Sequence, residues 1–225
     1  MSRIILFPGL GADPRLYGAQ RVAVPGVETP AWIEPRLRET LGDYARRWAD
    51  RLDLREPAVL GGVSMGGMVA LEMARHVGPE RARAVVLIGS CRHPSAANVL
   101  LRMSERVSRV VPDVVIGQGR RLGPVFLGRG GTIPAADRAL LARMACELPV
   151  SFIRWAARAV VEWEGCGDPG VPVHHIHGDQ DWVIALRRVR PTKVVPGGAH
   201  VLNMSHPREV NAFIADVAGG AAPAG

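Results

Sequence analysis

A glycine-rich heptapeptide constrains the fold of this chain more than any other feature. The sequence GGVSMGG, residues 61–67, follows an apolar run from Ala58 to Val63 and leads directly into a helical pattern from Met65 to His76. A serine on such a sharp turn from strand to helix has strained backbone angles, and side chains close to it would collide with neighbouring backbone. The glycines therefore predict a tight strand–turn–helix unit with Ser64 at its apex.

Strand-like and helical patterns alternate along most of the chain. The segments with strand character are Arg3 to Phe7, a weaker Val27 to Ile33, Ala58 to Val63, Ala84 to Gly89, Val171 to His177 and Thr192 to Pro196. Helical spacing of apolar residues covers Glu39 to Leu54, Met65 to His76 and Pro207 to Val217. This alternation predicts an α/β fold, a three-layer sandwich with helices on both faces of a mainly parallel sheet. The active site is expected at the carboxyl ends of the strands.

One interval breaks the alternation. Between residues 92 and 165 the sequence predicts helices at Asn98 to Val111, Ala135 to Glu147 and Ser151 to Glu164, without an obvious strand. We interpret this interval as a small helical cap inserted over the strand ends, although sheet cover is the alternative and must apply to the last helix. The predicted organisation is one domain over residues 1–218 and a flexible tail over 219–225, where small residues predict fraying.

The chain is basic, with a formal net charge of +7, which raises the question of nucleic-acid binding. Nucleic-acid binding would need the basic residues to cluster along one surface. Here they are almost all arginine, with Lys193 the only lysine, and they are scattered among acidic residues. We therefore expect a solvated arginine-rich surface and no nucleic-acid partner.

The compartment can be predicted from the cysteines and the apolar runs. Cys91, Cys146 and Cys166 are odd in number and widely spaced, which favours free thiols over disulfides or a zinc site. No apolar run approaches the roughly 20 residues that cross a bilayer. The segment MSRIILFPGLG lacks the features of a signal peptide. We expect a cytoplasmic protein that does not associate with membranes.

A second glycine-rich motif, FPGLGAD at residues 7–13, follows the first predicted strand. Its glycines would let backbone amides approach a ligand closely, as an oxyanion hole requires. We expect the N–H groups of Leu10 and Met65 to form that hole. A plain glycine-rich turn is the alternative, whereas a dinucleotide fingerprint is disfavoured because the G-x-G-x-x-G spacing is absent.

A serine needs a base and a carboxylate before it can act as a nucleophile. Two strand ends in the second half of the chain offer both. Asp179 and Asp181 follow the predicted strand in VPVHHIHG, and His200 follows the next strand in PGGAH. Loops at the same rim of the sheet could carry these groups to Ser64.

These motifs together resemble the α/β-hydrolase family, in its serine-nucleophile type of small carboxylesterases and thioesterases. GVSMGG resembles the family's nucleophile elbow, HGDQDWVI its acid-bearing stretch, and GGAH followed by LNMSHP its histidine loop. The resemblance implies Ser64 as nucleophile, His200 as base and Asp181 as the acid, with Asp179 in a turn or capping role and His206 at a helix start. It implies cleavage of an ester or thioester of a small to medium, fairly apolar acyl group, with no cofactor and no metal.

The chain departs from the family pattern at its beginning. It starts at what resembles the family's third strand, so the usual amino-terminal β-hairpin is expected to be missing and the sheet to have about six strands. Ser64 at the elbow also differs from the aspartate that dehalogenases and epoxide hydrolases of this fold use. Ala185 stands where a proline often follows the acid, without consequence for catalysis.

Other readings stay open at this level. The three histidines at positions 174, 175 and 177 invite a metal site, but nothing completes it, and a core or strand-end role is favoured. Trp182 and Cys91 are candidates for a substrate pocket, although each could belong to the core. The same triad could serve a lyase, cyclase or acyltransferase, or a ligand-binding protein with negligible turnover. The expected partner is a small-molecule acyl substrate, and the oligomeric state is not determined.

Overall fold

The computed structural model describes residues 2–97, 112–119 and 133–220, and a single parallel sheet organises them. The strands are β1 (Ile4–Phe7), β2 (Val27–Glu28), β3 (Ala58–Val63), β4 (Ala82–Ile88), β5 (Val173–Gly178) and β6 (Lys193–Val195). Their order in the sheet is β2-β1-β3-β4-β5-β6. All five pairings are parallel, so the predicted mainly parallel sheet of about six strands is confirmed.

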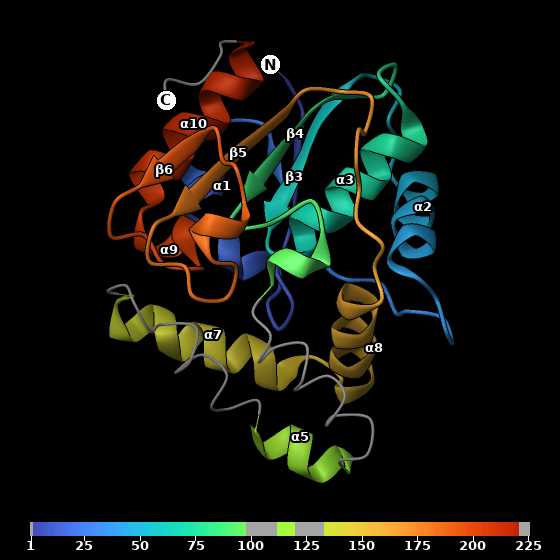
Figure 1. Ribbon diagram of the computed structural model, residues 1–225, viewed down its shortest axis with the longest axis vertical. Coiled ribbons are helices and arrows are strands. Elements are labelled where there is room, and N and C mark those ends of the chain that lie inside the picture. Colours follow the sequence, from blue (N-terminus) through green and yellow to red (C-terminus); the bar gives the residue numbers. More distant parts are fainter. Residues whose placement is uncertain (1, 98–111, 120–132, 221–225) are drawn as a thin grey trace.

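Helices cover both faces of this sheet. The helices among the described residues are α1 (Gly18–Ala23), α2 (Leu41–Arg51), α3 (Met65–Val77), α5 (Asp113–Gly119), α7 (Ala135–Glu147), α8 (Val150–Val161), α9 (Leu202–Ser205) and α10 (Pro207–Gly219). Figure 1 shows α2 and α3 on one side of the sheet and α1, α9 and α10 on the other. Helices α5, α7 and α8 lie beyond the carboxyl ends of the strands. The arrangement is the predicted three-layer α/β sandwich.

Two hydrophobic cores, one on each face, explain why the strands are apolar throughout. In β1, Ile5 and Phe7 belong to the core beneath α2, α3 and α8, whereas Ile4 and Leu6 belong to the core beneath α1 and α10. Successive strand residues point to opposite faces, so a strand covered on both sides needs apolar residues at every position. Burial of each such side chain contributes about 1.5–3 kcal/mol to folding.

The predicted element bounds agree with the structure, with three instructive differences. Helix α2 begins later than predicted because Thr40 caps it, accepting the N–H of Asp43 at 3.1 Å. Strand β2 stops at Glu28 although strand character was predicted to Ile33, and Pro30 cannot donate to a sheet ladder. Helix α10 runs to Gly219, one residue into the predicted tail, and residues 221–225 of that tail lie outside the described residues.

The helical interval is described only in part. Helix α7 has the predicted bounds, and α8 begins and ends slightly earlier than predicted. The helix predicted at residues 98–111 lies outside the described residues, and the division into one domain with a cap stays a prediction. Among the described helices, none has both the length and the apolar character needed to span a bilayer.

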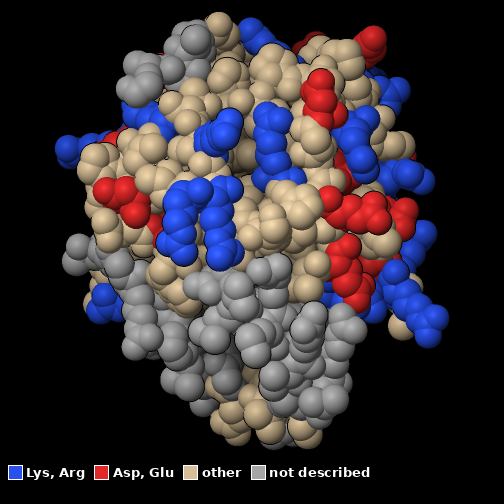
Figure 2. Space-filling view, in the orientation of Figure 1, with Lys and Arg blue, Asp and Glu red and all other residues tan. Residues whose placement is uncertain are grey.

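The surface carries both signs of charge. On the face shown in Figure 2, basic side chains stand among neutral ones, and acidic side chains gather towards the right-hand side. All three cysteines are free.

Candidate active site

Ser64 occupies a strained turn between β3 and α3. Its backbone angles are φ 53° and ψ −119°, and it is partly exposed although its neighbours in the motif are buried. The flanking glycines leave no room for side chains, because a Cβ on Gly62 or Gly66 would lie 2.4 Å or 2.0 Å from the carbonyl oxygen of Phe7. Such strain is typical of functional positions. The turn therefore presents the Ser64 hydroxyl at the carboxyl end of the sheet, as the sequence predicts.

Hydrogen bonds to two side chains from other segments hold this turn. The buried hydroxyl of Tyr17 accepts the N–H of Val63 at 2.8 Å and donates to the carbonyl of Phe7 at 2.7 Å. It thereby joins the ends of β3 and β1, which are neighbours in the sheet. The hydroxyl of Ser90 donates to the carbonyl oxygen of Ser64 at 2.7 Å.

The loop after β1 lies directly against the serine. A Cβ on Gly9 would be 3.6 Å from the Cβ of Ser64. Within the described residues, the backbone N–H groups of Leu10 and Met65 donate to no other group. For Met65 the reason is general, because the first residues of a helix have no acceptor in their own helix. Two amides with free donor capacity thus belong to the segments that flank Ser64.

His200 and Asp181 form a buried pair on the loops that follow β6 and β5. Nδ1 of His200 donates to Oδ2 of Asp181 at 2.8 Å. The other carboxylate oxygen accepts the N–H groups of Val183 and Ile184, both at 2.9 Å. Burial alone would raise the pKa of Asp181, but the charge and hydrogen bond of His200 and the amide of Ile184 lower it below its usual value. Asp181 is therefore ionised and fixes the tautomer of His200 with Nε2 free to accept a proton.

The last residue of β4 and the residue that follows it connect this pair to the serine. The carbonyl of Ile88 accepts the N–H of Ser64 at 3.1 Å. The next residue, Gly89, has φ 49°, and a Cβ there would lie 2.6 Å from the carbonyl oxygen of His200 and 3.6 Å from Oδ2 of Asp181. Among the described side chains none bonds the Ser64 hydroxyl, and catalytic hydrogen bonds of free enzymes often tighten only with substrate.

A model of the alpha/beta hydrolase family matches residues 4–213. The chain belongs to the alpha/beta hydrolase family. The resemblance inferred from the sequence motifs is therefore confirmed.

Several known proteins are similar to this alpha/beta hydrolase. A pimeloyl-[acyl-carrier protein] methyl ester esterase of Aromatoleum aromaticum is 34% identical over 92 residues, which cover 39% of this chain and 36% of that esterase. The chain thus matches about a third of this curated relative's length.

Solved structures match almost the whole chain. A thermophilic esterase from Thermogutta terrifontis has a TM-score of 0.73 at 20% identity, covering 99% of this chain and 91% of that one. The esterase RhEst1 from Rhodococcus has a TM-score of 0.73 at 15% identity, covering 97% and 90%. A hydrolase from Pseudomonas aeruginosa has a TM-score of 0.71 at 18% identity, covering 98% and 91%. Identities this low show a shared fold.

The alternative acid and base residues of this hydrolase have other partners. Asp179 accepts the N–H of Gly197 at 2.7 Å, which is a turn role, and His206 stands at the start of α10 before Pro207. His175 and His177 share one face of β5, with 3.0 Å between their ring nitrogens. Among the described residues, no group of three His, Cys, Asp or Glu side chains could hold a metal ion. The histidines of β5 are core and strand-end residues.

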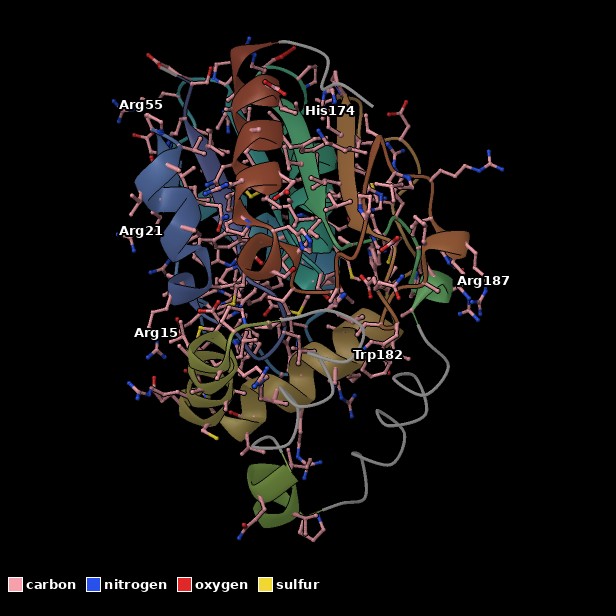
Figure 3. All side chains as sticks on the ribbon, turned by 90° about the vertical axis from the view of Figure 1, so that its left-hand side faces the viewer. Arg15, Arg21, Arg55, His174, Trp182 and Arg187 are labelled. Atoms are coloured by element: carbon pink, nitrogen blue, oxygen red, sulfur yellow. The ribbon has the colours of Figure 1, made fainter. Side chains whose placement is uncertain are left out.

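The two pocket candidates lie in different surroundings. Trp182 is partly buried against the core of the α2, α3 and α8 face, at the end of the α/β body that faces α7 and α8 (Figure 3). Cys91 is only 1% exposed, and burial raises the pKa of its thiol to about 12. Cys91 is thus a protonated core thiol, and a pocket role for either residue stays a prediction.

Three residues that hold this site together have no signature in the sequence. They are Tyr17 and Ser90, described above, and Trp32, whose indole N–H donates to the carbonyl of Ala12 at 3.0 Å. Trp32 also stacks on Phe7 with ring centroids 6.1 Å apart. No local pattern could reveal them, because each acts on a segment that is distant in the sequence.

Proposed function

We propose that this alpha/beta hydrolase cleaves a carboxylic ester or thioester through an acyl intermediate on Ser64. In the first step His200 takes the proton of the Ser64 hydroxyl while its oxygen attacks the substrate carbonyl. Asp181 keeps the imidazole oriented and stabilises the imidazolium that forms. His200 then gives the proton to the leaving alcohol or thiol, and the acyl–serine ester remains.

The same groups complete the reaction in the second step. Water attacks the acyl–serine carbonyl, His200 takes a proton from that water, and the proton returns to Ser64 as the carboxylic acid leaves. In both steps the amides of Leu10 and Met65 would bind the oxyanion, and a donor of this kind is worth about 10²–10³ in kcat. The chemistry needs no metal and no cofactor.

The buried hydrogen bond between His200 and Asp181 is the observation that carries this proposal. A glycine-rich turn that served only for packing or phosphate binding would need no imidazole–carboxylate pair beside it. A charged carboxylate is costly to bury unless it is fully hydrogen-bonded. Here hydrogen bonds to both oxygens of Asp181 offset that cost. The pair lies at the carboxyl ends of the strands, as the elbow does, and nucleophilic catalysis requires this arrangement.

Apolar residues around the loop after β1, which carries Leu10, support a substrate with an apolar acyl group. The ring of Trp32 contacts those of Phe7 and Phe152, with centroid distances of 6.1 Å and 5.7 Å. Leu10 and Leu148 pack against the same core and are partly buried. Three of the similar proteins above are described as esterases, and one acts on a methyl ester, which supports the same bond type for this chain.

The test is covalent labelling of Ser64 by a fluorophosphonate probe, followed by turnover of a chain-length panel of nitrophenyl esters and acyl thioesters. The wild-type protein should be labelled stoichiometrically and should release nitrophenol with a burst. Ser64→Ala should abolish both, whereas Ser151→Ala, which removes an exposed serine on α8, should change neither. Labelling that persists in Ser64→Ala would assign the nucleophile to another residue. Delivery of the acyl group to an acceptor other than water would favour an acyltransferase.

A further inference from the structure

A second buried histidine lies behind the Asp181–His200 pair. His177 is the next-to-last residue of β5, and its side chain is completely buried. Its Nε2 is 2.7 Å from the carbonyl oxygen of Ile184 and 3.4 Å from Oδ2 of Asp181. The mechanism proposed above makes no use of this imidazole.

The partners of His177 fix its tautomer. A carbonyl oxygen can only accept, so Nε2 of His177 must carry the proton that bonds Ile184. Its Nδ1, 3.0 Å from Nε2 of His175, then accepts from that ring. Burial lowers the pKa of His177, and the nearby Asp181 does not reverse this, so the ring stays neutral and its N–H points at the acid loop.

Both backbone polar groups of Ile184 are hydrogen-bonded. Its N–H bonds Oδ1 of Asp181 at 2.9 Å, and its carbonyl accepts from His177. Ile184 also forms an isolated antiparallel bridge with Ala97, on the segment that follows β4. Strand β5 is rigid because β4 and β6 flank it, and His177 itself pairs with Val194. A fixed strand thus anchors the loop that carries Asp181.

We propose that His177 is a positioning residue of the active site. Its Nε2–H ties the carbonyl of Ile184 to β5 and faces the carboxylate of Asp181, so that Asp181 keeps the orientation in which it bonds Nδ1 of His200. His175 supports this role by donating to Nδ1 of His177. The inference rests on the ester-cleaving function proposed above, because it assigns His177 to the same machinery.

The test compares two substitutions, of which only one keeps a hydrogen-bond donor. His177→Leu removes the N–H donor, whereas His177→Gln keeps one that can reach the carbonyl of Ile184. We expect His177→Leu to lower kcat by about 10- to 100-fold with KM within twofold, because small displacements of catalytic groups cost rates of this size. His177→Gln should recover most of that loss. The control is His174→Gln, a partly buried neighbour on β5.

A readout independent of turnover separates this inference from the proposed function. The proton on Nδ1 of His200, shielded from solvent by its bond to Asp181, should give a downfield NMR signal in the wild type and in His177→Gln. It should broaden or vanish in His177→Leu, with each variant kept below its thermal midpoint. An unchanged kcat and signal in His177→Leu would overturn the proposal, as would equal losses in the Leu and Gln variants. If the wild type itself shows no labelling of Ser64, the proposed function fails, and the His200 signal alone still decides the role of His177.

Discussion

At the scale of single residues, Asp181 is proposed as the acid because of the groups that its two oxygens accept. Oδ1 of Asp181 takes two backbone N–H groups, and Oδ2 takes the imidazole of His200. A carboxylate is needed because only an acceptor at Oδ2 leaves Nε2 of His200 as the basic nitrogen. Asp179 has the same side chain two residues earlier but bonds a loop amide.

This difference predicts opposite outcomes for two conservative substitutions. Asp181→Asn should lower kcat by about 10⁴-fold, because an amide N–H opposite His200 favours the wrong tautomer. KM should change little, since substrate does not bind to Asp181. Asp179→Asn is the control and should keep kcat within a few-fold. Steady-state kinetics on a nitrophenyl ester measure both, and similar rates in the two variants would contradict the assignment of the acid.

The hydroxyl of Tyr17 gives a second residue-scale prediction. Tyr17→Phe leaves the N–H of Val63 and the carbonyl of Phe7 without their shared partner inside the protein, which should cost about 1–3 kcal/mol of unfolding free energy. It should also lower kcat, because these two groups set the spacing of Ser64 and the loop after β1.

The chain supplies a matched control for Tyr17 in Tyr44, its only other tyrosine, whose hydroxyl donates to the carbonyl of Ile33 at 2.9 Å. Tyr44→Phe should lower stability without a comparable loss of kcat. Urea denaturation and steady-state kinetics on both variants separate the two effects. Equal kcat in Tyr17→Phe and the wild type would show that the hydroxyl has no influence on the site.

The proposed site residues have local signatures in the sequence. Ser64 stands in a glycine pattern, and Asp181 and His200 follow strand ends that parallel topology brings to one rim. Tyr17 has no such signature, because its hydroxyl acts on Val63, 46 positions away. His177 is one of three close histidines in the sequence, but its hydrogen bond to the acid loop depends on the folded arrangement of the chain.

At the scale of elements, the elbow depends on close contact between β1 and the start of α3. A Cβ on Gly66 would lie 2.0 Å from the carbonyl oxygen of Phe7 and 2.4 Å from that of Pro8. Real Cβ atoms do not approach backbone this closely, so helix or strand must move. The glycines of the motif are thus a packing requirement as well as a conformational one.

Gly66→Ala should therefore destabilise the protein by about 3 kcal/mol or more, as overpacked core substitutions do in severe cases. Gly18→Ala is the control, because Gly18 has helical angles of φ −52° and ψ −47° and no atom within 4 Å of its added Cβ. That substitution should raise stability by about 0.4–1 kcal/mol. Urea denaturation of both variants is the measurement, and a Gly66→Ala protein as stable as the wild type would show that the contact relaxes easily.

Elements were predictable from the sequence where burial determines the pattern of apolar residues. They were less predictable where tertiary contacts determine the bounds of an element. β1 and β3 were identified because strands covered on both faces are apolar throughout. The sequence predicts a longer β2 than the structure has. Trp32 and Ile33 are apolar, but they bond the carbonyl of Ala12 and the hydroxyl of Tyr44 instead of continuing the sheet. Side-chain contacts of this kind leave no periodic signal.

At the scale of the whole molecule, buried neutral histidines make stability depend on pH. Burial lowers the pKa of His175 from 6.5 to about 3, with further contributions from His177 and Arg92. The unfolded chain therefore binds a proton at this position between pH 6.5 and about 3, while the folded protein does not. The contribution of His175 to stability is complete above the unfolded pKa and is lost progressively as the pH falls towards the folded one.

The free energy of unfolding should thus decrease as the pH is lowered through this range, and less steeply in His175→Gln than in the wild type. The control is His76→Gln, which removes an exposed histidine at the end of α3 and should leave the slope unchanged. Urea denaturation at a series of pH values gives the slopes. Equal slopes in the wild type and His175→Gln would mean that His175 is not held neutral by burial.

The central claim is that Ser64, His200 and Asp181 act as one catalytic unit, and a double-mutant comparison of kcat tests it most directly. Groups that act as a unit have strongly non-additive effects, so that removing a second member costs little once the first is gone. We predict that Ser64→Ala, His200→Ala and the combined variant have the same residual rate on a nitrophenyl ester, within about tenfold. Losses that multiply in the combined variant would show that the two residues act independently, and this would contradict the account.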